Sequence, residues 1–134
     1  MAFLKFEDLR VFRAAEALAD EIWDVVNDWE TFAKLTVGKQ LARSADSIGA
    51  NIAEDSGRET AKDNQRFVRI SRGSLNGAKY RLCRASPRNL IKPEEALKPT
   101  RMIEEIGPSL NAYLKFLNQS IRSLTAPMLN PKQD

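Results

Sequence analysis

The chain contains no histidine among its 134 residues. This absence removes the commonest general base, the Ser-His and Cys-His nucleophile pairs and nearly all transition-metal sites. Two carboxylate pairs, Glu94-Glu95 and Glu104-Glu105, do occur, but neighbours on a helix point about 100° apart and do not share a site. Gly73 and Gly77 lie within a helical pattern rather than after a strand, so they form no phosphate-binding loop. We therefore expect no enzymatic activity, no cofactor and no metal.

Cysteine and long apolar runs are equally scarce. A lone Cys83 cannot form an internal disulfide, and at helical spacing it is a small packing residue. No apolar run approaches the roughly 18 residues of a membrane span. Residues 1–8 lack the charged lead-in and apolar stretch of a signal peptide, so we expect a cytoplasmic protein. With 43% hydrophobic residues, the length suits one domain, which we place at residues 1–126, followed by a flexible C-terminal tail at 127–134.

Charge is present but unevenly placed. Residues 1–57 carry six basic and eleven acidic residues, residues 58–92 carry ten basic and two acidic residues, and the remainder carries five of each. The concentrated basic segment favours an anionic partner, through counterion release from phosphates or attraction to a membrane surface. The alternative is that these charges form a solvated helix face.

Helical periodicity, and no convincing strand alternation, runs through the chain. It predicts four helices: from about Asp8, as N-cap, to Trp29; from about Val37 to Glu54; from Thr60 to about Ala85; and from near Pro93 onwards. Short connections make an all-α, antiparallel up-down-up-down four-helix bundle the simplest architecture. We expect Pro99 and Gly107-Pro108 to kink or divide the last helix. Trp23 and Trp29 are interpreted as core or subunit-contact residues, because they belong to the apolar stripe of the first helix or its edge.

The predicted third helix has two different faces. Winding it at about 100° per residue places an apolar face opposite a basic one. The apolar face contains Phe67, Ser71, Ser74, Leu75, Ala78, Leu82 and Ala85. The basic face contains Arg58, Lys62, Arg66, Arg69, Tyr80 and Arg84, with Gly73, Asn76 and Gly77 leaving a shallow place among them. One aromatic ring within a basic stripe is typical of surfaces that hold phosphates and stack a base, so these six residues are the candidate nucleic-acid-binding site.

Asn51 and Glu54, at the end of the second predicted helix, are interpreted as structural. Asn51 can hydrogen-bond a neighbouring helix or loop, and Glu54 can pair with Arg58 or with Arg43 across a contact.

Three groups of residues resemble one family of four-helix bundle proteins, the 23S rRNA intervening-sequence (S23-like) family, which includes the accessory variability proteins of diversity-generating retroelements. They are Phe6-Glu7-Asp8-Leu9 with Val11, Phe12 and Ala15; Arg43, Ser47-Ile48 and Asn51-Ile52-Ala53-Glu54 followed by Arg58; and Phe67 with Arg72-Gly73-Ser74-Leu75. The chain departs from the family pattern at Asp55, where glycine is usual, at Gly77, where glutamate is frequent, and at Pro99 and Pro108.

The resemblance implies a homo-oligomer, a pentameric ring or barrel, without catalytic activity. In the retroelement branch it implies binding of nucleic acid and of an associated reverse transcriptase. Two functions therefore remain open. The first is a nucleic-acid-binding accessory protein, presenting RNA or DNA to a reverse transcriptase. The second is a structural protein–protein interaction oligomer with no nucleic-acid role, whose basic face is buried or neutralised between subunits.

Overall fold

The computed structural model describes the backbone of residues 6–55 and 61–129 and the side chains of residues 6–54 and 62–119. Within these ranges the chain is helical and contains no strand. A 3₁₀ turn, η1 (Phe6–Asp8), precedes four long helices: α1 (Arg10–Asn27), α3 (Lys39–Asp55), α4 (Ala61–Ala85) and α5 (Pro93–Leu129). Two short elements, α2 (Thr31–Ala33) and the π-helix η2 (Lys34–Gly38), connect α1 to α3.

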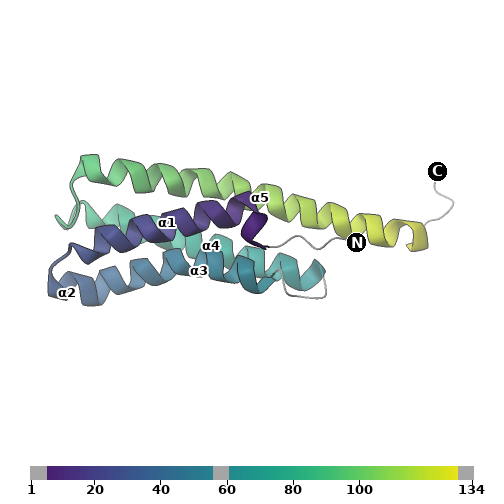
Figure 1. Cartoon of the computed structure of the whole chain (residues 1–134), viewed down its shortest axis with the longest axis horizontal. Helices are drawn as coiled ribbons and strands as arrows, with labels where there is room; N and C mark the ends of the chain where they lie inside the picture. Colours follow the sequence, from purple (N-terminus) through teal and green to yellow (C-terminus); the bar gives the residue numbers. More distant parts are fainter. Residues whose placement is uncertain (1–5, 56–60, 130–134) are drawn as a thin grey trace.

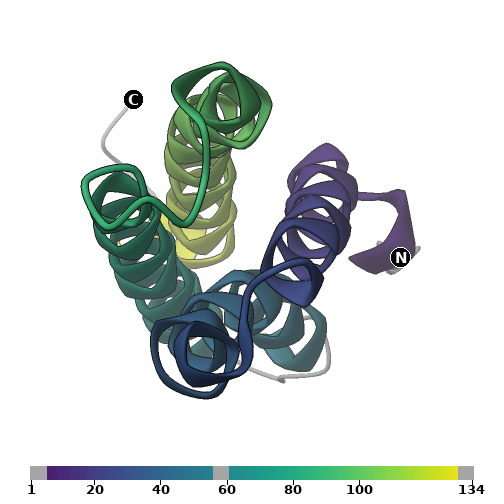
Figure 2. The ribbon, with the colours of Figure 1, turned by 90° about the vertical axis from the view of Figure 1, so that its left-hand side faces the viewer.

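The long helices pack in a ring, in which α3 contacts α1 and α4, and α5 contacts α4 and α1. α1 and α4 therefore lie at diagonal corners of the bundle (Figure 2). Successive helices run in opposite directions along the long axis (Figure 1). The pairing of residues shows the same reversal: Gln65 and Arg72 of α4 bond Asn118 and Asn111 of α5, so later residues of one helix meet earlier residues of the other.

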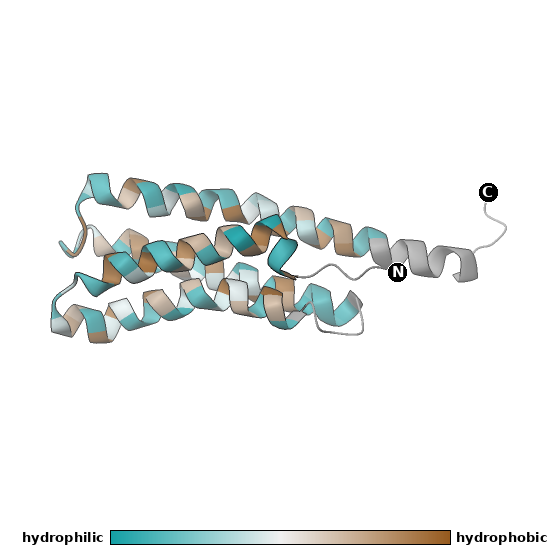
Figure 3. Cartoon of the chain, in the orientation of Figure 1, coloured by the Kyte–Doolittle hydropathy of each residue, from teal (hydrophilic) through white to brown (hydrophobic). Residues whose placement is uncertain are grey.

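The core follows the periodicity of the sequence. The expected seam of α3, Leu41, Ala45, Ile48 and Ile52, is fully buried. The α1 stripe is buried at Val11, Ala15, Leu18, Ile22 and Val26, and the α5 stripe at Ile103, Ile106, Leu110 and Leu117. Hydrophilic and hydrophobic residues alternate in short bands along every helix (Figure 3). Within the described residues, no helix is both long enough and apolar enough to span a membrane.

The start of α1 differs from the prediction. Asp8 is not the N-cap, because it belongs to η1, and Leu9 occupies the cap position without a side-chain hydrogen bond. Asp8 instead lies 3.8 Å from the Arg13 guanidinium. The helix ends at Asn27, two residues before Trp29, whose side chain is nonetheless buried in the core.

Helical structure resumes six residues earlier than predicted, at Thr31 instead of Val37. The Glu30 carboxylate caps this start by accepting hydrogen bonds from the backbone N–H groups of Phe32 and Ala33, at 3.2 and 2.9 Å. The wider π turn then carries the chain towards α1. A Cβ atom on Gly38 would lie 2.7 Å from Val26 Cγ1, so only glycine fits this approach.

α5 is one continuous helix, so Pro99 and Gly107-Pro108 do not divide it, and of the expected kink or division only the kink stays a prediction. Pro93 is its first residue, where a missing N–H costs nothing, as expected. Pro99 is buried, and the residues that follow it, Ile103 and Ile106, are anchored in the core. This packing holds the helix together although each internal proline removes one backbone hydrogen bond. The helix continues to Leu129, three residues into the predicted tail, and projects beyond the other helices (Figure 1).

Candidate nucleic-acid interface

The α3–α4 seam sets the orientation of α4. Its buried Ser71 donates a hydrogen bond to the Ile48 carbonyl of α3 at 3.0 Å, and Ser74 donates to the Ser47 hydroxyl at 3.0 Å. Leu75, Ala78, Leu82 and Ala85 are buried on the same side of α4, as predicted from the helical winding, together with Val68, which the winding did not assign. These contacts fix which face of α4 points outward.

The outward face carries five of the six candidate residues. Lys62, Arg66, Arg69, Tyr80 and Arg84 are all exposed, and the Tyr80 side chain is 64% accessible. We call these five residues the α4 face. At about 1.5 Å per residue they extend over roughly 33 Å, nearly the whole length of the helix. The sixth candidate, Arg58, lies outside the described residues.

The four basic side chains of the α4 face make no ion pair with a described carboxylate. The ion pairs that the described residues do show join Arg13 to Asp8 and Lys98 to Glu21, both away from α4. α4 contains a single acidic residue, Asp63, against seven basic ones. The positive charge of the α4 face is therefore not neutralised by any carboxylate among the described side chains.

The predicted shallow place on this face is only partly present. A Cβ atom added to Gly73 would meet nothing within 4 Å, so the helix surface is open there, and Asn76 is exposed. Gly77 is different, because a Cβ atom there would lie 2.8 Å from Arg81 Nη1 and 3.5 Å from Ser44 Oγ. Its glycine is used for the close contact with α3 rather than for an external partner.

Two further α4 arginines flank the α4 face, and sequence analysis did not assign them to the site. Arg81 donates to Ser44 Oγ at 2.9 Å and to Gln40 Oε1 at 3.3 Å, both on α3. Arg72 donates to Asn111 Oδ1 of α5 at 2.6 Å, while its buried Nε has no partner within the described residues. The partners of both guanidinium groups are neutral, so no described carboxylate balances their positive charge beside the α4 face.

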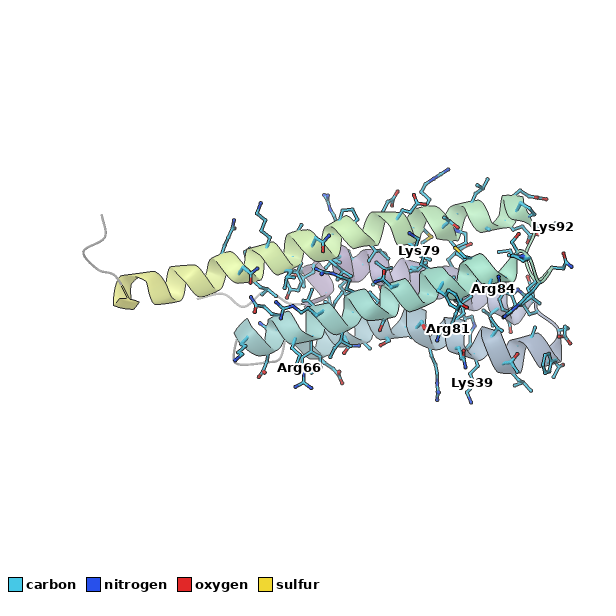
Figure 4. The ribbon with its side chains drawn as sticks, turned by 180° about the vertical axis from the view of Figure 1, so that it is seen from behind. Lys39, Arg66, Lys79, Arg81, Arg84 and Lys92 are labelled. Carbon is cyan, nitrogen blue, oxygen red and sulfur yellow. The ribbon has the colours of Figure 1, made fainter. Side chains whose placement is uncertain are left out.

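Basic residues of other elements lie close to one end of α4. Figure 4 shows Lys39 of α3 and Lys92 of the α4–α5 connection at the same end of the bundle as Arg81 and Arg84. Lys39 was missed because it belongs to the acidic segment 1–57, where a count of charge by segment hides it. Its position as the first residue of α3, beside Gln40, is the signal that links it to Arg81.

Asn51 and Glu54 take no part in this surface. Asn51 Nδ2 donates to the Ser47 carbonyl at 2.7 Å and to Ser47 Oγ at 2.9 Å, within its own helix rather than to another one. Glu54 is exposed and makes no ion pair with Arg43. Across the described side chains, no group of three or more carboxylate or thiol residues is placed to hold a metal ion.

The fold and this surface define a class, the four-helix bundle with one strongly basic outer helix. The family model described as 23S rRNA-intervening sequence protein matches residues 7–112, and the chain therefore belongs to that family.

A solved structure agrees with this fold. The crystal structure of a protein of unknown function from the S23 ribosomal protein family of Bacteroides thetaiotaomicron has a TM-score of 0.74 to this chain. It covers 84% of this chain and 99% of its own length at 24% identity, so the similarity concerns the fold alone. None of the curated proteins matches the sequence.

Proposed function

We propose that this protein is a non-catalytic, homo-oligomeric nucleic-acid-binding protein whose α4 face holds single-stranded RNA or DNA with little sequence preference. The observation that carries the proposal is the α4 face itself: four exposed basic side chains and one exposed tyrosine project from one side of one helix, with no ion pair to a carboxylate in the part of the chain that the structure describes. Arg58 extends the same helical stripe in the sequence and is included in the proposal.

The chemistry of the α4 face suits a single strand better than a duplex groove. Lysine and arginine contact phosphates without reading sequence, and tyrosine can stack on any base because every base has a π-face. The open surface at Gly73 leaves room for a backbone or base between Arg69 and Tyr80. Arg72 and Arg81 add positive potential on the two sides, which helps to keep a strand on this helix.

A charge-reversal experiment tests the proposal. Arg66→Glu with Arg69→Glu should abolish binding of a fluorescent 12-nucleotide oligouridylate in an anisotropy titration. The matched control is Arg101→Glu with Lys115→Glu, which makes the same charge change at exposed positions of α5 and should leave most of the affinity. Equal loss in both double variants would show that only net charge matters and would reject the α4 face as the site.

Salt dependence gives an independent readout of the same contacts. If three or four phosphates are neutralised, the logarithm of affinity should fall with the logarithm of salt concentration with a slope of roughly −2 to −3, at about −0.7 per phosphate for single strands. Repetition of the site around an oligomer would make the slope steeper. A slope near zero would contradict phosphate binding.

The oligomer is part of the proposal. Large hydrophobic side chains remain exposed on the single chain, among them Phe32, Leu35, Leu97 and Phe116, which supports further burial between copies. We expect a homopentamer, following the resemblance. Light scattering at micromolar concentration checks this, and a monomeric mass would contradict it.

A structural oligomer without a nucleic-acid role is the second candidate, and charge supports it. Residues 6–30, which include α1, hold eight acidic and two basic residues, whereas α4 holds one acidic and seven basic residues. Since α1 and α4 lie at diagonal corners, the acidic corner of one copy could meet the basic corner of the next. In that case the Arg66→Glu, Arg69→Glu variant would dissociate the oligomer.

Presentation of RNA or DNA to a reverse transcriptase is the narrower role within the first candidate. A reverse-transcriptase gene with repeats beside this gene would favour it. Co-purification of that reverse transcriptase with the tagged protein would test it directly.

A further inference from the structure

A pocket of about 290 Å³ lies between α1 and the η2–α3 segment, outside the α4 face. We call the buried or half-buried apolar members of its lining, Val26, Gly38 and Ala42, the floor, and its other members the rim: Trp23, Asn27, Lys34, Lys39, Arg43 and Asp46. The size is at the lower end of the roughly 300 to 1,000 Å³ of small-molecule sites, so it suits one planar group rather than an extended cofactor.

Trp23 is the unexpected member of this pocket. Sequence analysis interpreted both tryptophans as core or contact residues, but Trp23 is 63% exposed whereas Trp29 is 7% exposed. No described aromatic ring stacks on Trp23. An exposed indole beside an apolar floor presents a free stacking surface, and tryptophan is the best side chain for such stacking.

Part of the pocket lining comes from a π-helix, an uncommon backbone conformation. The π-helix η2 supplies Lys34 and Gly38, and the lack of a Cβ atom at Gly38 lets it lie against Val26. Within this turn Thr36 Oγ1 donates a hydrogen bond to the Phe32 carbonyl at 2.7 Å. π turns within helices are frequently found at functional sites.

The charge of the rim selects the ligand. Three cations, Lys34, Lys39 and Arg43, and one carboxylate, Asp46, surround an apolar floor and an indole. This combination fits a planar base attached to a phosphate, because the base can stack on the indole while ammonium and guanidinium groups bind the phosphate.

We infer that this pocket binds an unpaired nucleobase with its phosphate, Trp23 stacking on the base and Lys34, Lys39 and Arg43 contacting the phosphate. The inference rests on the proposed function, because it makes the pocket a second contact point for the same strand. Lys39 lies at the same end of the bundle as Arg81 and Arg84 (Figure 4), and the adjacent Gln40 accepts a hydrogen bond from Arg81. Basic groups therefore connect the α4 face to the pocket.

The test uses the emission of Trp23, obtained as the difference between wild type and Trp23→Phe. Titration with the 12-nucleotide oligouridylate and, separately, with uridine monophosphate should quench this emission. Quenching by the strand alone, or by both, supports a base within a strand as the ligand. Quenching by the mononucleotide alone supports a free nucleotide. Quenching by neither overturns the inference.

Anisotropy of the labelled strand separates the pocket from the α4 face. Trp23→Ala should weaken binding about tenfold or more, as expected for loss of a stacked base, whereas Trp23→Phe, which keeps an aromatic ring at the same position, should retain most of the affinity. Unchanged binding by Trp23→Ala would overturn the inference and leave the proposed function standing. If the Arg66→Glu, Arg69→Glu variant still binds the strand while Trp23→Ala does not, the α4 face is rejected as the binding site and the pocket is retained.

A contact between copies is the competing occupant. It predicts that Trp23 emission is shielded from iodide without any nucleotide and becomes accessible on dilution. That result would overturn the inference, whereas iodide access at all protein concentrations would support it.

Discussion

α1 and α4 occupy diagonal corners of the same bundle and both pack on α3. They differ in the residues that face α3 and in the residues that face solvent. Against α3, α1 uses close apolar contacts, as where Phe12 and Ala15 lie against Gly49, whereas α4 adds hydroxyl hydrogen bonds, as between Ser74 and Ser47. Towards solvent, α1 is acidic and α4 is basic. The fold does not require this outer asymmetry, since helix packing needs only the buried stripe. It is therefore evidence about partners.

The largest expected effect comes from α3, on which both helices depend. Ile48 is fully buried, so Ile48→Ala should lower the free energy of unfolding by about 2 to 5 kcal/mol. Urea melts followed by circular dichroism measure it. Lys62→Ala on the exposed α4 face is the control and should change stability by less than about 0.5 kcal/mol. Similar losses in both variants would mean that the helix faces are wrongly assigned.

Variants of two glycines test the contrast between the close packing against α1 and the open outer surface of α4. Gly38→Ala places a Cβ atom 2.7 Å from Val26 Cγ1, and this overpacking should cost about 1 to 3 kcal/mol. Gly73→Ala meets nothing within 4 Å and replaces a poor helix former, so it should raise stability by up to about 1 kcal/mol. Thermal melts of the two variants should therefore shift in opposite directions. A shift in the same direction would contradict the close contact at Gly38 or the open surface at Gly73.

Periodicity predicted the buried residues of α3 and α4 because a helix that packs on a core must repeat its apolar residues on one side. It could not predict the close approach of η2 to α1, since Gly38 and Val26 belong to different elements and meet only in the folded chain. Gly77 was misplaced for a related reason. Winding one helix gives directions but not neighbours, and Ser44 of α3 lies in the direction that was taken to be open.

The candidate site was easier to place than to complete. The five residues of the α4 face share one helix, so their common direction follows from their spacing. Lys39 and Trp23 come from other elements, and only the packing of α1, η2 and α3 brings them to a pocket. Trp23 is not a core residue of the single chain, because its position falls at the edge of the apolar stripe, and its interpretation as a subunit-contact residue stays a prediction.

Tyr80 tests whether the α4 face binds by charge alone. Tyr80→Ala should weaken binding of the oligouridylate by about 1 to 3 kcal/mol if the ring stacks on a base. Because the side chain is 64% exposed, the free energy of unfolding should stay within about 0.5 kcal/mol of wild type. Tyr80→Phe keeps the ring and should retain most of the affinity. Unchanged binding by Tyr80→Ala would reduce the site to its lysine and arginine residues.

The smallest effect is expected at the acidic corner. Asp20→Asn with Asp24→Asn removes two exposed charges from α1, which lies diagonally across the bundle from α4. At physiological salt the screening length is about 8 Å, so in the Trp23→Ala background, where only the α4 face holds the strand, the affinity for the oligouridylate should change less than about twofold. The matched variant Asp63→Asn removes the one acidic residue of α4 and should strengthen binding more than the α1 pair does. If the α1 variant instead lowers the oligomer mass in light scattering, the acidic corner contacts a neighbouring copy. The asymmetry between α1 and α4 would then serve assembly, and the structural candidate would replace nucleic-acid binding.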